Sequence, residues 1–120
     1  MNKSCKDTWE TYGSSWKAES TAEKRALFKR SLDPACQYHD PLIKTQGWDE
    51  LEAYMLDFHK NIPGGHFVTT YFLAHSNKSI SCWEMRNAEN VLLGDGISYG
   101  EYNESGKLIS MTGFFEPPQG

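Results

Sequence analysis

The sequence predicts an α+β fold in which three helices come first and an antiparallel sheet follows. Up to about residue 61 the apolar residues recur at helical spacings, and capping residues precede the first two helical segments. From residue 66 onward, β-branched and aromatic residues form runs that are separated by turn residues. The length of 120 residues suits one domain, which we place at residues 1–116 with a flexible tail at 117–120.

Charge and apolar content argue against several classes of function. The net charge of −4 is spread over mixed acids and bases without a basic run, which argues against a nucleic-acid surface. No window approaches the roughly 20 apolar residues of a membrane span, and the first twenty residues lack the apolar part of a signal peptide. Three cysteines at wide spacing are expected to remain free. We expect a cytoplasmic protein that contacts neither nucleic acid nor membrane.

The first helix is predicted over residues 4–16. Ser4 and Asp7 resemble a capping box, and four residues share one helical face: Cys5, Trp9, Tyr12 and Trp16. This aromatic stripe is either part of the core or the lid of a ligand cavity. Both interpretations stay open at this point.

Two further helices are predicted over residues 21–31 and 48–60. Ser20 and Glu23 form a capping box for the second helix, and Pro34 follows its end. The third has the clearest amphipathic pattern, with acidic residues on the polar face. Its apolar face comprises Leu51, Tyr54, Met55, Phe58 and, at its end, His59.

Strands are predicted at residues 35–39, 66–75, 80–87, 91–102 and 107–115. In the segment 91–102, small residues alternate with larger ones, so Gly94, Gly96, Ser98 and Gly100 share one face. This face either bends the sheet or leaves room for a ligand.

The segment 36–42 contains the strongest candidate for chemistry. It places Tyr38, His39 and Asp40 directly before Pro41, which pushes Asp40 into an extended conformation at the end of a strand. An aspartate before proline commonly starts a turn by accepting backbone N–H bonds. Alternatively, the Asp40 carboxylate faces a pocket and accepts a proton there.

The order and spacing of these motifs resemble the SnoaL-like group of the nuclear-transport-factor-2-like superfamily, which includes ketosteroid isomerases and small polyketide cyclases. The matching features span almost the whole chain: Trp9, Trp16, residues 38–41, residues 47–51, Trp83 and residues 102–108. The resemblance implies a cone-shaped fold, with three N-terminal helices packed on a strongly curved antiparallel sheet around an apolar pocket. This fold hosts enzymes, binding proteins and dimerisation modules.

In the isomerases of this superfamily, the aspartate of an Asp-Pro pair is the base that moves a proton beside a ketone. The resemblance carries this role to Asp40, and we expect Tyr12 or His59 to help to orient the substrate. The isomerases also use a second, protonated aspartate, as in one of the standard examples of a perturbed carboxyl group. Here Ser98 falls at that position, so the sequence argues against a true ketosteroid isomerase.

The sequence therefore predicts a small pocket protein that binds or converts an apolar, carbonyl-bearing molecule. Proton transfer, isomerisation, cyclisation and hydration all remain open, as does a non-catalytic binding or dimerisation domain. We expect no metal or other cofactor and a homodimer that forms through the sheet face. The predicted pocket residues are Trp9, Trp16, Tyr38, Met55, Phe58, Trp83, Ser98, Met111 and Phe115.

Overall fold

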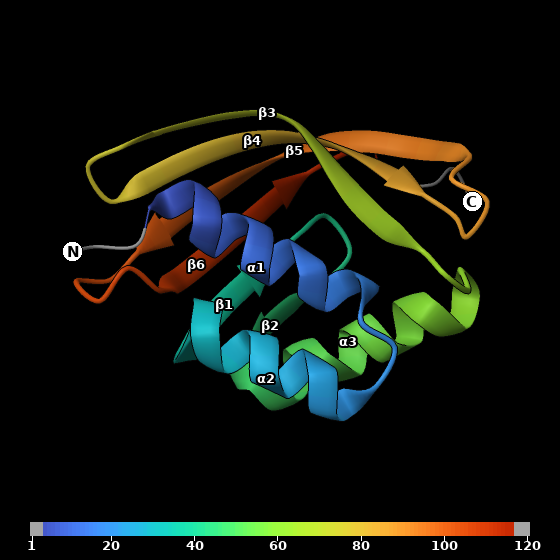
Figure 1. Ribbon diagram of the computed structural model, residues 1–120, viewed down its shortest axis with the longest axis horizontal. Helices are drawn as coiled ribbons and strands as arrows, with labels where there is room; N and C mark the ends of the chain where they lie inside the picture. Colours follow the sequence, from blue (N-terminus) through green and yellow to red (C-terminus); the bar gives the residue numbers. More distant parts are fainter. Residues whose placement is uncertain (1–3, 117–120) are drawn as a thin grey trace.

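The computed structural model describes residues 4–116, and the predicted tail at 117–120 lies outside the described residues. It contains three helices, which are α1 (Cys5–Lys17), α2 (Thr21–Ser31) and α3 (Gly47–Asn61). Figure 1 shows all three on one side of a single sheet, with α1 between the long strands of that sheet and the α2–α3 pair. The α+β class and the order of helices before the long strands are confirmed.

The sheet has six strands in the order β2-β1-β6-β5-β4-β3. The strands are β1 (Leu32–His39), β2 (Lys44–Gln46), β3 (His66–His75), β4 (Lys78–Arg86), β5 (Leu92–Tyr102) and β6 (Leu108–Phe114). The predicted antiparallel run from β3 to β6 is confirmed. The prediction of a wholly antiparallel sheet is wrong, because β1 pairs in parallel with β6.

The strong curvature that we expected for the sheet is not seen. Figure 1 shows a twisted sheet that is not strongly curled over the helices. Its register shifts only locally, for example between Thr69 and Tyr71 and between Glu101 and Tyr102. Irregularities of this kind increase the twist of a strand pair and bend it locally. They are too few here to close the sheet into a cone.

Local signals account for the helix ends. The Ser4 and Ser20 hydroxyls accept hydrogen bonds from the backbone N–H groups of Asp7 and Glu23, each at 3.1 Å. These bonds satisfy donors that a helix leaves unpaired in its first turn. The helix α2 therefore has the predicted bounds, while α1 and α3 differ from the prediction by a residue at either end.

The buried core joins α1 and α3 to the sheet. Phe28, Leu32, Leu51, Met55 and Leu108 are fully buried, and the α1 stripe of Trp9, Tyr12 and Trp16 is almost completely buried beside them. Each aromatic ring of this stripe removes a large apolar area from water. No helix in residues 4–116 combines the length and apolarity needed to cross a membrane.

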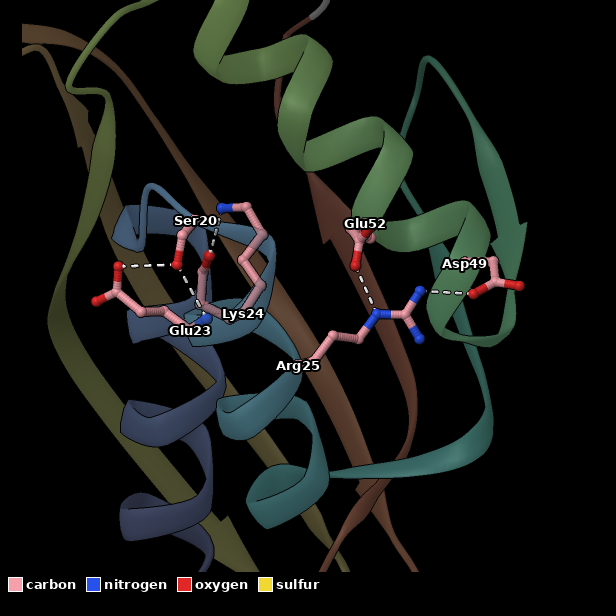
Figure 2. A network of polar contacts seen from close by, with 7 residues as sticks. Ser20, Glu23, Lys24, Arg25, Asp49 and Glu52 are labelled. Atoms are coloured by element: carbon pink, nitrogen blue, oxygen red, sulfur yellow. Dashed lines mark hydrogen bonds and ion pairs between the residues drawn. The ribbon is translucent and has the colours of Figure 1, made fainter.

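Two basic residues of α2 fix the helices to one another. Arg25 binds the carboxylates of Asp49 and Glu52 on α3, at 2.6 and 2.5 Å (Figure 2). The neighbouring Lys24 is fully buried, and its ammonium donates to the carbonyl oxygens of Ser15, at 2.9 Å, and Ala18. Burial lowers the pKa of Lys24. A cation at the C-terminal end of α1 also complements the helix dipole.

Candidate functional site

A cleft of about 380 Å³ lies between α1 and the inner face of the sheet. We call it the α1 cleft. Trp9, Tyr12 and Trp16 form its helical wall, and Phe67 and Trp83 form much of the opposite wall. A volume of this size falls in the range of roughly 300–1,000 Å³ that is usual for small-molecule sites. The aromatic stripe of α1 thus belongs both to the core and to the cleft wall.

Tyr12 lines the cleft although it is only 3% exposed. Its oxygen accepts a hydrogen bond from the indole N–H of Trp16, one helical turn later, at 3.0 Å. Within residues 4–116 no acceptor is found for the proton of this hydroxyl. Burial raises the pKa of Tyr12, so the group remains a neutral donor at ordinary pH.

Trp83 and Ser98 form a second pair on the sheet side of the cleft. The indole N–H of Trp83 donates to the Ser98 hydroxyl at 2.9 Å, and both residues line the cleft. Gly96 makes room for the indole, because a Cβ atom there would lie 2.4 Å from a Trp83 ring carbon. At Gly96 the small residue therefore makes room for the Trp83 side chain, whereas the sequence analysis expected this face to bend the sheet or to leave room for a ligand.

Polar residues surround the aromatic walls of the cleft. Glu10, Ser14 and Lys17 line it from α1, and His66 lines it from the start of β3. A second hollow of about 830 Å³ shares Ser14, Lys17 and His66 with it. None of these four residues was predicted to line a pocket, because single polar residues carry no sequence signal for the cavity that they border.

The Asp40 carboxylate accepts four hydrogen bonds. One oxygen accepts from the backbone N–H groups of Leu42 and Ile43, at 2.8 and 3.1 Å. The other accepts from the hydroxyls of Tyr38 and Tyr54, at 2.6 and 2.8 Å. The backbone contacts make Asp40 a turn former between β1 and β2, as one of the two interpretations proposed. The carboxylate does not line the α1 cleft.

Tyr38 connects this carboxylate with the cleft. Its ring lines the cleft and packs against Trp16, with ring centroids 5.8 Å apart, while its hydroxyl donates to Asp40. Tyr54 donates to the same carboxylate oxygen but does not line the cleft. Burial is the main cause of the raised pKa values of Tyr38 and Tyr54. The sequence analysis placed Tyr54 on the apolar face of α3 but did not foresee its bond to Asp40.

The other predicted site residues lie around the cleft rather than in its wall. Met55 and Met111 are fully buried in the core, and neither lines the cleft. Phe58 stacks on Phe67, and Phe115 packs edge-on against Trp83. These two rings therefore pack against the cleft residues Phe67 and Trp83 but do not line the cleft themselves.

His59 also lies behind the cleft wall. Its Nε2 atom contacts the backbone carbonyl of Trp16, which ties α3 to the end of α1. His59 itself does not line the cleft. Among the residues that the structure describes, no three His, Cys, Asp or Glu side chains gather in a way that would hold a metal ion.

Phe67 is the main aromatic residue of the cleft that the sequence analysis missed. It lies in the second position of β3 and contacts Trp16, Phe58 and Trp83 with centroid distances of 5.1–5.4 Å. The alternation of residues 66–75 could have indicated an inward side chain here. It could not indicate that this strand crosses α1.

Comparisons with known proteins support the fold. No protein-family model matches this sequence, and no curated protein shows a significant match. Among solved structures, a candidate isomerase of the SnoaL-like family from Agrobacterium tumefaciens is 21% identical, with a TM-score of 0.84 over 92% of this chain and 96% of that chain. A candidate SnoaL-like polyketide cyclase from Jannaschia sp. is 11% identical, with a TM-score of 0.75 over 97% and 91%.

An NTF2-like protein of unknown function from Cytophaga hutchinsonii is also similar. It is 11% identical, with a TM-score of 0.73 over 98% of this chain and 94% of that chain. These identities are low, but each alignment covers nearly the whole of both chains. The three helices and the six-stranded sheet thus have the same fold as these SnoaL-like and NTF2-like structures.

Proposed function

We propose that this chain binds an apolar, carbonyl-bearing small molecule in the α1 cleft. The observation that carries this proposal is that Tyr12, whose hydroxyl proton has no acceptor within residues 4–116, lines a cleft walled by aromatic rings. The transfer of an apolar molecule from water to a cleft with such walls is favourable in free energy. A carbonyl oxygen on that molecule supplies the acceptor that the Tyr12 proton lacks.

The names of similar structures agree with this class of ligand. Two of them are a candidate isomerase and a candidate polyketide cyclase. Polyketides are carbonyl-bearing carbon chains, and a fold alone does not fix the reaction. The proposal therefore rests on the cleft of this chain and takes only the ligand class from its neighbours.

A series of matched aromatic compounds tests the proposal. The compounds are 1,4-diethylbenzene, 4-ethylacetophenone and 1,4-diacetylbenzene, which have nearly the same size and carry none, one and two carbonyl groups. We expect 4-ethylacetophenone to bind about fivefold or more tightly than 1,4-diethylbenzene, since a hydrogen bond contributes roughly 1 kcal/mol. The variant Tyr12→Phe should lose this preference, and its melting temperature shows whether it is folded. No binding of any compound to the wild type would refute the proposal.

Proton transfer is a second candidate function, and one contact favours it. Tyr38 lines the cleft and donates to Asp40 at 2.6 Å, so a carboxylate behind the wall is linked to the cleft by a single hydroxyl. In the proposed step, a proton leaves the carbon beside the carbonyl group for Tyr38 Oη while the Tyr38 proton moves to Asp40. The electron pair of the C–H bond forms the enolate, whose oxygen Tyr12 stabilises.

The four donors around Asp40 weigh against this step. In this step Asp40 takes the proton that Tyr38 already donates to it, so it loses the negative charge that strengthens its bonds from Leu42, Ile43 and Tyr54. Binding without catalysis is therefore the leading proposal, and catalysis through Asp40 is the alternative.

Two tyrosine variants separate these functions. Both Tyr38→Phe and Tyr54→Phe remove a donor to the same oxygen of Asp40, but only Tyr38 lines the cleft. The assay is hydrogen–deuterium exchange at the acetyl methyl group of 4-ethylacetophenone, followed by NMR in D₂O. Catalysis through the relay predicts that Tyr38→Phe and Asp40→Asn abolish accelerated exchange and that Tyr54→Phe keeps most of it. Exchange at the uncatalysed rate with wild-type protein would eliminate the relay.

A further inference from the structure

Two hydroxyl groups of the α1 cleft have the same kind of support on opposite walls. On α1, the Trp16 indole donates to Tyr12 at 3.0 Å. On the sheet, the Trp83 indole donates to Ser98 at 2.9 Å. All four residues line the cleft, so both pairs face the same space.

The chemistry of an indole decides which way each hydroxyl points. A tryptophan N–H only donates, so each hydroxyl oxygen in these pairs is the acceptor. The hydroxyl proton is then directed away from the indole and is available to another acceptor. Within residues 4–116 neither the Tyr12 nor the Ser98 hydroxyl has an acceptor for its own proton. Both hydroxyl groups are thus preorganised to donate a hydrogen bond to an acceptor on a ligand.

We propose that the α1 cleft recognises a ligand with two separate hydrogen-bond acceptors, one bound by Tyr12 and the other by Ser98. This inference rests on the proposed function and adds the second acceptor to it. A compound with two carbonyl groups on one apolar frame meets the requirement. Tyr12 alone would select for one carbonyl group, whereas the pair selects for a dicarbonyl compound.

Ser81 provides a matched control for Ser98. The two serines are directly opposite each other on β4 and β5, and their side chains share the inner face of the sheet. Ser81 is 1% exposed, its hydroxyl has no hydrogen-bond partner within residues 4–116, and it does not line the cleft. The variants Ser98→Ala and Ser81→Ala remove the same atom from neighbouring positions, and only the first removes a donor from the cleft.

The experiment compares 1,3- and 1,4-diacetylbenzene with 4-ethylacetophenone by calorimetric titration. Two isomers are used because each places its carbonyl groups at a different separation. For the wild type we expect the better diacetyl isomer to bind about fivefold more tightly than 4-ethylacetophenone. Ser98→Ala should remove this preference while the affinity for 4-ethylacetophenone stays within about twofold. Ser81→Ala should keep the preference, and melting temperatures confirm that both variants are folded.

Two results would overturn the inference. In one, the wild type binds 4-ethylacetophenone but shows no preference for either diacetyl isomer. In the other, the preference is the same in Ser98→Ala as in the wild type. Both results leave the proposed function intact. Failure of 4-ethylacetophenone itself to bind would instead reject the proposed function and the inference together.

Discussion

The indole N–H of Trp16 donates a hydrogen bond to the Tyr12 hydroxyl at 3.0 Å, across one turn of the same helix. Side chains four residues apart lie one above the other on a helix, so the sequence spacing alone brings these two groups together. In this bond the hydroxyl oxygen is the acceptor, and the hydroxyl proton has no acceptor within residues 4–116. One helix thereby supplies a wall of the cleft and the donor that we propose for a ligand.

Filling the floor of the cleft should block binding. Gly113 lines the cleft, and a Cβ atom there would lie 3.6 Å from Asp40 Cβ and 3.7 Å from Ser98 Oγ, which are ordinary contacts. The variant Gly113→Val therefore fits the backbone but occupies cleft volume. We expect a loss of about tenfold or more in affinity for 4-ethylacetophenone, equivalent to roughly 1.4 kcal/mol.

Gly94 is the control for this variant. It lies in the same sheet but does not line the cleft, and a Cβ atom there would meet only Met85, at 3.8 Å. Gly94→Val should bind like the wild type. Equal affinities of Gly113→Val and wild type would show that the ligand lies elsewhere.

Alkaline pH should destabilise the fold through its tyrosines. Five of the six tyrosines have raised pKa values, mainly because of burial: Tyr12, Tyr38, Tyr54, Tyr99 and Tyr102. In the unfolded chain tyrosine loses its proton near pH 10, so above this pH the folded state holds more protons than the unfolded state. Stability is thus fully present below about pH 10 and falls as the pH rises further.

Urea denaturation between pH 8 and 11 measures this dependence. Tyr12→Phe removes one of the titrating groups, so the decline above about pH 10 should be shallower in this variant. An identical slope in wild type and Tyr12→Phe would contradict the burial of the Tyr12 hydroxyl.

Lys24 should contribute to stability through its two backbone acceptors. Its ammonium binds the carbonyl oxygens of Ser15 and Ala18, and the side chain is fully buried. Lys24→Met keeps most of the apolar stem but leaves both carbonyls without this donor. We expect a loss of about 1–3 kcal/mol in the free energy of unfolding. Lys29→Met, at an exposed position of the same helix, should change it by less than about 0.5 kcal/mol.

The outer face of the sheet should mediate self-association. Cross-strand pairing places Tyr71, Cys82, Ile97 and Phe114 in one row across β3–β6, and Leu73 and Ile80 continue the next row. Five of these side chains are more than 40% exposed: Tyr71, Leu73, Ile80, Ile97 and Phe114. A contiguous apolar patch of this kind commonly marks an interface.

Sedimentation equilibrium tests the predicted homodimer. Ile97→Glu places a charge in the middle of the patch and should shift the protein to the monomer. Leu56 is 39% exposed on α3, and the helices lie on the opposite side of the sheet from these rows (Figure 1). Leu56→Glu should therefore leave the dimer unchanged. A monomeric wild type at high concentration would exclude this interface.

Most of the fold could be predicted from local sequence signals. The caps at Ser4 and Ser20 and the apolar periodicity located the helices, and turn residues separated the long strands. The strand β2 was missed because its three residues are too few to show alternation. The parallel pairing of β1 with β6 was missed because residues such as Tyr38 and Met111 are far apart in sequence, and no local pattern specifies a partner at that distance.

The candidate site was less predictable than the fold. The aromatic stripe and, from the small residues of β5, Ser98 line the cleft, because their periodicities already fixed which face they occupy. The donors around Asp40 were not predictable beyond its own turn. Tyr54 reaches Asp40 only because α3 packs against β1, and this packing depends on the whole core.

The central claim is that a bound carbonyl group accepts the proton of the Tyr12 hydroxyl. Infrared difference spectroscopy of 4-ethylacetophenone labelled with ¹³C at the carbonyl carbon tests it most directly, since a hydrogen bond lowers the carbonyl stretching frequency. We predict a lower frequency in the wild-type complex than in an apolar solvent and a return toward the solvent value in Tyr12→Phe. The same frequency in both complexes would contradict it.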